Sequence, residues 1–117
     1  GIGEAVTAPA KTTFRGSFVG TAKYTGSGNV SIVKAGTTRT IKVASNFRAD
    51  RRSIRLRMYL AKTPGGRGGI DLGAMRETGA QSFRVPARVN LGTYRYVVAW
   101  CAAVNEPIAS AKLNLVR

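Results

Sequence analysis

Histidine is absent from this chain of 117 residues, and cysteine occurs once, at Cys101. Without histidine, the protein cannot use Ser-His-Asp or Cys-His catalysis, and it cannot bind zinc or haem through an imidazole. One cysteine cannot form an internal disulfide or a Cys-x-x-Cys redox pair. These absences leave Cys101 as a lone thiol whose role has to be explained.

Acidic residues are also scarce, because five Asp and Glu stand against nineteen Lys and Arg, for a formal net charge of +14. So few scattered carboxylates argue against a paired-acid hydrolase. A surface of this charge attracts polyanions such as anionic lipid head groups, nucleic acid or acidic polymers, and it steers acidic protein partners. We therefore expect no independent enzymatic activity and keep binding functions open.

Long apolar runs are missing as well, since none approaches the ~18 residues that a membrane-spanning helix needs. Hydrophobic residues still make up 44% of the chain, which is enough for one packed core. The first stretch is small, polar and proline-containing, so we expect residues 1–13 to form a flexible linker. Residues 14–117 are expected to form a single domain.

The apolar residues recur with a period of two rather than 3.6. In the stretch IRLRMYL, residues 54–60, apolar residues that include Ile54 and Met58 alternate with polar ones, which predicts a half-buried strand. YVVAWCAA, residues 96–103, is apolar on both faces and is expected to be a central strand. The predicted fold class is all-β, an antiparallel β-sandwich or barrel of about seven to eight short strands.

The most glycine-rich stretch is KTPGGRGG, residues 62–69. It lacks the Gly-Lys-Ser/Thr ending of a phosphate-binding loop. Its composition predicts a mobile hairpin tip, so the sequence assigns no ligand to it.

Several blocks of sequence follow one another in a recognisable order. They are GSFVGTAKYTGSGNVSIV, IKVASNF, LRMYLAK, IDLGAMRETGAQSFRVP and VNLGTYRYVVAWCAAVNEPIASAKL. The last two are the most specific, with an Asp71-Leu72-Gly73 turn before Pro86 and a strand that ends at Trp100 and Cys101. This order resembles the DM-thirteen domain, the electron-transfer domain first noted in Skeletor-type proteins, over about residues 14–113.

The resemblance implies a small extracytoplasmic all-β domain, in the periplasm or at the cell surface. Such a domain is tethered to a membrane in the full-length protein and exchanges electrons with a redox partner protein. The resemblance also implies that Cys101 is the redox centre, either as a bare thiol or as a ligand to a group such as haem. The expected cofactor is thus haem or none, and without histidine a second sulfur ligand would come from Met58 or Met75. The chain departs from the family pattern at Arg52 and Ser53, which replace a Pro-Asp pair.

Two interpretations of Cys101 remain open. A free cysteine is among the most buried residue types and then packs as a small, unreactive hydrophobic side chain. A redox role needs access for a partner and a nearby cation that stabilises the thiolate. Met58 lies at a core-facing position in its strand, so we favour packing for it. Trp100 points to the opposite face from Cys101 in a regular strand, as a core or interface anchor.

Residues in the turns that lead to the last strands are expected to be structural. We expect Asp71 to cap the backbone of its turn and Gln81 to hold the same loop through a buried amide. The full structural set is Asp71, Gly73, Gly79, Gln81, Pro86 and Trp100.

The densest group of basic residues supplies an alternative function. The candidate polyanion-binding residues are Arg51, Arg52, Arg55, Arg57 and Tyr59. Basic side chains with an interleaved aromatic residue can contact phosphates and stack on bases, although a solvated outer face explains the same pattern. No nucleic-acid motif accompanies these residues, so no specific nucleic acid is expected. The alternative is a non-catalytic surface module for anionic lipid, envelope polymer or an acidic protein partner.

Overall fold

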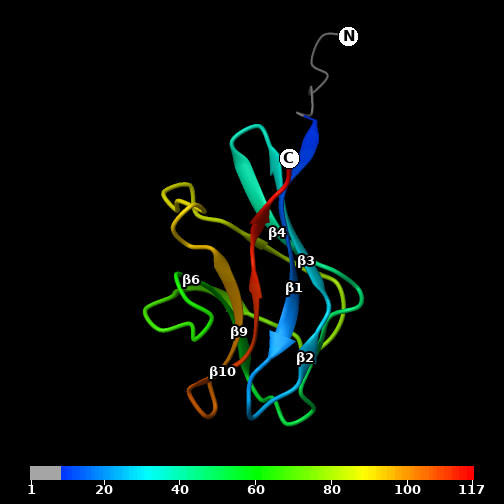
Figure 1. Cartoon of the computed structure of the whole chain (residues 1–117), viewed down its shortest axis with the longest axis vertical. Helices are drawn as coiled ribbons and strands as arrows, with labels where there is room; N and C mark the ends of the chain where they lie inside the picture. The colour runs from blue at the N-terminus through cyan, green and yellow to red at the C-terminus, as the bar shows by residue number, and fades with distance from the viewer. Residues whose placement is uncertain (1–8) are drawn as a thin grey trace.

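A computed structural model of the protein describes residues 9–117. Eight strands form an antiparallel sheet that curls into a nearly closed barrel, in the order β7-β6-β9-β10-β1-β3-β4-β8 (Figure 1). The strands are β1 (Ala10–Gly20), β3 (Asn29–Ala35), β4 (Thr38–Val43), β6 (Leu56–Ala61), β7 (Ile70–Ala74), β8 (Gln81–Arg84), β9 (Tyr96–Cys101) and β10 (Glu106–Lys112). The two end strands, β7 and β8, approach each other without pairing. The predicted all-β class is confirmed, and its architecture is a barrel.

The long strand β1 joins the two halves of the barrel. It pairs with β3 along most of its length and with β10 near its end. Gly16 permits the contact with β10, because a Cβ there would collide with the carbonyl oxygen of Lys112. The short strand β11 (Asn114–Leu115) pairs with β1, while β2 (Gly26–Ser27) and β5 (Arg48–Ala49) pair with each other.

The ordered domain begins earlier than the sequence predicts. Ala10 pairs with Ala35 and Thr12 with Val33, so the end of the predicted linker 1–13 belongs to β1. No side chain of residues 10–13 is buried, so this part of β1 carries no apolar alternation by which the sequence could reveal it. Residues 1–8 of the predicted linker lie outside the described residues.

The barrel interior is filled by aliphatic side chains from all around the sheet. The largest fully buried aliphatic and sulfur-containing side chains of this interior are Ile32, Ile41, Met58, Leu60, Val97, Cys101, Ile108 and Leu113. Strand β9 lies between β6 and β10, as Figure 1 shows, and its middle residues are buried from both faces. The prediction of a central strand covered on both sides is confirmed.

The expectation for Ile54 is wrong. The alternating pattern places this residue on the core face, but the residue is 60% exposed and lies outside β6, which begins at Leu56. Arg55 is the physical reason, because its φ of 54° is left-handed and turns the chain before the strand begins. The alternating pattern therefore holds only from Leu56 onward.

No part of the described chain forms a long apolar helix of the kind that crosses a membrane.

Candidate functional site

Cys101 lies at the end of β9 with its side chain in the barrel interior. It is 2% exposed, and the strand register places it opposite Leu56 of β6 and Glu106 of β10. Its thiol donates a hydrogen bond of 3.0 Å to the backbone carbonyl oxygen of Ile54. Within the described chain Cys101 is a free, buried cysteine that forms no disulfide.

The sulfur contacts the backbone of Ile54, which belongs to the segment of residues 50–55 that we call the cover segment. Arg51, Arg52, Ile54 and Arg55 in this segment are exposed, although the Ile54 carbonyl contacts the sulfur. The amide of Ala102, which follows Cys101, donates to the Arg55 carbonyl at 3.0 Å. The thiol is therefore part of the buried core, and it lies next to a surface segment.

Asp50 and Arg52 fix the start of the cover segment. The Asp50 carboxylate accepts hydrogen bonds from Arg52 Nε at 3.0 Å, from Arg52 Nη2 at 2.9 Å and from the Thr25 amide at 2.9 Å. The Arg52 side chain and then its backbone amide hold the pKa of Asp50 well below its usual range. Arg52 also donates to the Lys23 carbonyl at 2.8 Å, and its guanidinium carbon lies 5.1 Å from the ring centroid of Tyr24. One side chain thus joins the cover to the loop after β1.

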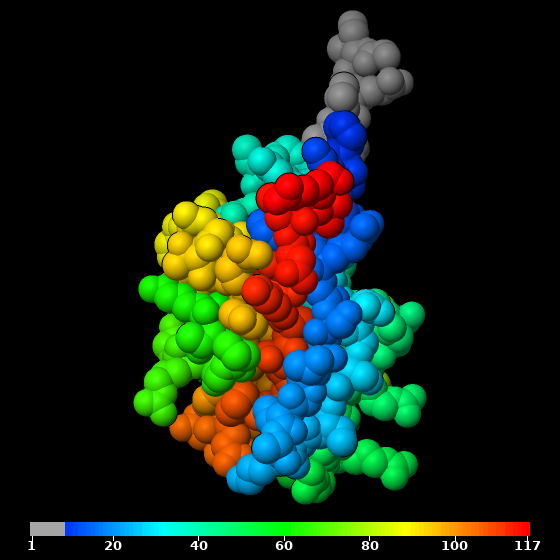
Figure 2. Space-filling view, viewed as in Figure 1, coloured from blue at the N-terminus to red at the C-terminus, as the bar shows by residue number. Residues whose placement is uncertain are grey.

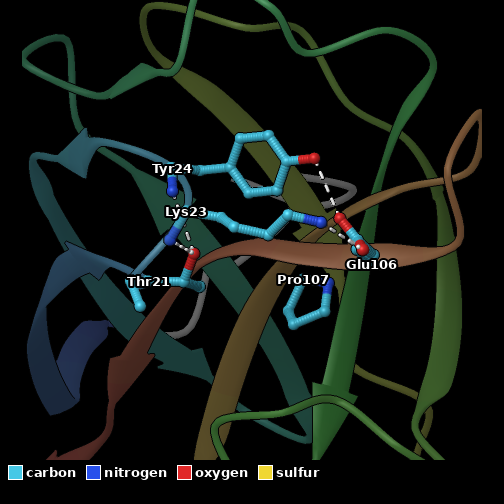
Figure 3. A pocket seen from close by; sticks show the side chains of 6 residues that line it. Thr21, Lys23, Tyr24, Glu106 and Pro107 are labelled. Atoms are coloured by element: carbon cyan, nitrogen blue, oxygen red, sulfur yellow. Dashed lines mark hydrogen bonds and ion pairs between the residues drawn. The ribbon is translucent and has the colours of Figure 1, made fainter.

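The same loop is tied to the strand opposite Cys101. The Glu106 carboxylate accepts hydrogen bonds of 2.8 Å from Lys23 Nζ and from the Tyr24 hydroxyl (Figure 3). Both bonds lower the pKa of Glu106, and the bond from Lys23 has the larger effect. The bond to Glu106 likewise raises the pKa of Tyr24. The side chains border a hollow of about 250 Å³. A continuous polar network therefore runs from the cover through Tyr24 to Glu106.

The outer face of β9 carries a different group of side chains. Trp100 stacks on Tyr59 with ring centroids 5.3 Å apart and planes 11° from parallel. Arg57, also on this face, forms an ion pair of 2.8 Å with Asp71. Trp100 thus points away from Cys101, as the strand period predicts, and its partner is an aromatic ring on the neighbouring strand.

The residues predicted to be structural lie in the turns around β7 and β8. Asp71 accepts a hydrogen bond of 2.9 Å from the amide of Gly73, whose φ is 118°. The Gln81 side chain accepts a hydrogen bond of 2.8 Å from the Arg76 amide and donates one of 3.0 Å to the Arg76 carbonyl, but it is half-buried rather than buried as expected. Gly79 has a φ of 88°. These contacts set the geometry of β7 and of the turn between β7 and β8.

Pro86 follows β8 and has a backbone role. Its carbonyl accepts hydrogen bonds from Arg39 Nη2 at 2.9 Å and from the Val89 amide at 3.0 Å. The proline thus ends the strand and starts the turn that leads toward β9.

The predicted polyanion-binding residues do not form one strand face. Arg52 is engaged with Asp50 in the cover segment, and Arg57 is engaged with Asp71 on the outer face. Arg51 lies in a turn before the left-handed residue Arg55. Arg55 and Arg57 do border one hollow of about 370 Å³ beside the end of β9.

Met58 and Cys101 do not fit a haem. Met58 is 0% exposed and pairs with Ala99, so its sulfur lies in the packed barrel interior. Five hollows of about 250–510 Å³ among residues 9–117 are bordered by other residues, and neither Met58 nor Cys101 borders any of these five. The same residues contain no cluster of three acidic, cysteine or histidine side chains that could hold a metal ion.

Sequence reasoning missed the polar network around Tyr24 and Glu106. The two residues are separated by 82 positions, and only the pairing of β1 with β10 brings them together. The sequence contains one weak indication of this network: Asp50 is the only acid in the arginine-rich stretch RADRRSI, and such an acid is suited to an ion pair.

Comparison with known families supports the resemblance seen in the sequence. The family model described as Electron transfer DM13 matches residues 17–113. The chain belongs to the Electron transfer DM13 family. No curated protein and no solved structure matches the chain. Cys101 and the cover segment both lie inside the region that matches the DM13 model.

Proposed function

We propose that this DM13 domain transfers electrons through Cys101, which is kept as a reduced thiol beneath the cover segment. Membership of an electron-transfer family supports a redox role. Cys101 is the only thiol of the chain, and histidine is absent. The observation that carries the proposal is the hydrogen bond of 3.0 Å from the Cys101 thiol to Ile54, a residue whose side chain is 60% exposed.

Access to the sulfur requires only local opening of the cover segment. Its Ser53 is buried, and within the described chain the Ser53 hydroxyl has no hydrogen-bond partner. Arg55 adopts a left-handed φ of 54°. A buried unpartnered hydroxyl costs about 1–3 kcal/mol and such a backbone conformation costs about 1–3 kcal/mol. Both costs favour opening of this segment while the barrel stays folded.

The chemistry balances with water and a one-electron acceptor. A thiol that takes up the oxygen of one water becomes a sulfenic acid and releases two electrons and two protons. Two acceptor molecules take the electrons, and a reductant of the thiol or dithiol class returns the sulfenic acid to the thiol with loss of water. The exposed Arg51, Arg52 and Arg55 give an opened site the cationic surroundings that favour a thiolate.

Electron release to ferricyanide tests the proposal. The wild-type protein should reduce ferricyanide in an amount equal to two electrons per chain, with the loss of the titratable thiol. Cys101→Ala should abolish this reduction, whereas Trp100→Phe, which changes the neighbouring residue on the other face, should retain it. Equal reduction by the wild type and Cys101→Ala, or none by the wild type, would contradict the proposal.

Binding to an anionic surface is the second candidate function. Its support is the net charge of +14, together with the exposed side chains of Arg51 and Arg55. As part of this proposal we place the domain outside the cytoplasm, beside anionic lipid or envelope polymer, as the family resemblance implies. Vesicles with and without anionic lipid test it: binding should need the anionic lipid and should fall steeply with salt. Salt-independent binding, or none at low salt, counts against this function.

A further inference from the structure

A second site lies on the outer face of the barrel, opposite Cys101. A hollow of about 510 Å³ lies between the loop of residues 64–69 and the β9–β10 turn. Its lining includes Tyr59, Trp100, Arg67, Asn105 and Pro107. In Figure 2 the green surface of this loop and the orange surface of the turn lie near each other at the left edge. The volume is within the range of about 300–1,000 Å³ that small-molecule sites occupy.

The aromatic pair gives this hollow a preference for planar rings. Tyr59 and Trp100 stack on each other at 5.3 Å, and both rings are partly exposed. Two aligned rings extend the apolar surface on which a third flat π system can lie. Stacking on such surfaces tolerates many ring systems, because it depends on the flat face rather than on particular hydrogen bonds.

The glycine loop connects the antiparallel hairpin of β6 and β7, as the sequence predicts, and at Gly66 it folds onto this aromatic surface. Gly66 has a φ of 76°, and a Cβ there would lie 3.1 Å from the Trp100 ring and 3.2 Å from Val98. The loop also holds its own turns, through hydrogen bonds from Gly66 to Thr63 and from Gly69 to Gly66. It covers Val98, which is fully buried although it lies on the outer face. The loop is thus a built wall of the hollow.

The charge of the hollow favours an anion. Arg67 lines it and is exposed, while no acidic residue lines it. A guanidinium group can both pair with an acidic substituent and stack on an aromatic ring. The charge of Arg57, which pairs with Trp100 across the sheet, is balanced by Asp71. Arg67 is therefore the cation that this site offers to a ligand.

We propose that the hollow between residues 64–69 and the Tyr59–Trp100 pair binds a small planar aromatic anion. The ring lies against the aromatic pair and the acidic substituent reaches Arg67. The proposal concerns binding alone and does not depend on electron transfer by Cys101. It gives the outer face a ligand site, on the opposite side of β9 from the thiol.

Trp100 is the only tryptophan, so its fluorescence reports on this site directly. The probe is anthraquinone-2-sulfonate, a flat ring system with one sulfonate, titrated against free N-acetyltryptophanamide as the reference for simple collision and light absorption. Saturable quenching of Trp100 is expected, with cyclohexanesulfonate failing to compete. Quenching that never saturates, or that matches the free tryptophan reference, would overturn the proposal.

Paired variants separate this site from general attraction to a basic protein. Arg67→Ala should weaken binding about five-fold and Tyr59→Leu about ten-fold. Arg84→Ala removes an exposed arginine from β8 and should change the affinity less than two-fold. Equal weakening by Arg67→Ala and Arg84→Ala would show non-specific attraction and overturn the site. Cys101→Ala should bind the probe normally, so a failure of the thiol proposal and a failure of this one give different results.

Discussion

Cys101 and Trp100 are neighbours in the chain, yet they occupy different environments on the two faces of β9. The thiol points into a packed barrel and is closed off by the cover segment. The indole points outward, stacks on Tyr59 and borders an open hollow. The period of two in a strand is enough to separate a protected redox candidate from an accessible binding surface by a single residue.

The two faces also differ in what holds their covering segments in place. The cover over Cys101 is tied by charged groups, from Asp50 and Arg52 to Tyr24 and Glu106. The loop over Trp100 is held by glycine geometry and by contact with the ring. The position of the cover segment should therefore change with pH and with charge substitutions. The position of the loop of residues 64–69 should change with substitutions of its glycines.

Truncating one residue on each face should give the largest difference in stability. Met58→Ala removes a fully buried side chain and should lower the free energy of unfolding by about 2–5 kcal/mol. Tyr59→Ala, on the outer face, should cost less, because its ring is only partly buried and the stacking contributes about 0.5–1.5 kcal/mol. Urea unfolding measures the free energy of unfolding of both variants. A loss for Tyr59→Ala as large as that for Met58→Ala would contradict the assignment of the faces.

Two glycine variants should separate the effect of contact between the loop of residues 64–69 and Trp100 from the effect of backbone strain in that loop. Gly66→Ala and Gly68→Ala both place alanine at a positive φ, of 76° and 71°, which costs about 1–2 kcal/mol. Only at Gly66 would the new Cβ approach Trp100, since nothing lies within 4 Å at Gly68. Trp100 emission should therefore shift in Gly66→Ala and stay unchanged in Gly68→Ala. The same shift in both variants would mean that the loop does not rest on the ring.

Acid should weaken the polar network that holds the cover segment. Its effect on the free energy of unfolding should be smaller than that of the substitutions above. The folded-state pKa values of Asp50 and Glu106 are lowered, so their contribution is complete above the ordinary carboxyl pKa of about 4 and is lost as the pH falls below it. The urea midpoint should fall over that range. Glu106→Gln should make the fall shallower, because the amide does not titrate. A midpoint that rises on acidification would contradict the direction of these pKa shifts.

The sequence predicts the strands better than the segments between them. The alternation from Leu56 onward and the apolar stretch of β9 follow from patterns of side chains along a strand, and both are present in the structure. The exposure of Ile54 could not be predicted, because it depends on the left-handed conformation of Arg55. The pattern of apolar and polar residues along the chain does not specify the φ angle of Arg55.

The candidate site was predicted only in part, for a related reason. Cys101 could be singled out because it is the only cysteine of the chain and because it lies in the most specific part of the family resemblance. The contact between Tyr24 and Glu106 depends on the register of distant strands, which one sequence does not reveal. The position of the glycine loop on Trp100 likewise depends on tertiary packing, whereas its composition suggested only mobility.

The rate at which the neutral reagent iodoacetamide alkylates Cys101 tests the central claim most directly. The native thiol should react at least about a hundred-fold more slowly than the thiol of the urea-unfolded chain. Arg52→Ala, which unties the cover, should react about ten-fold faster than the wild type while the barrel remains folded. The control Arg84→Ala, which removes an exposed arginine from β8, should react at the wild-type rate. A native thiol that reacts as fast as the unfolded one, or an Arg52→Ala variant no faster than the wild type, would contradict a thiol protected by this cover.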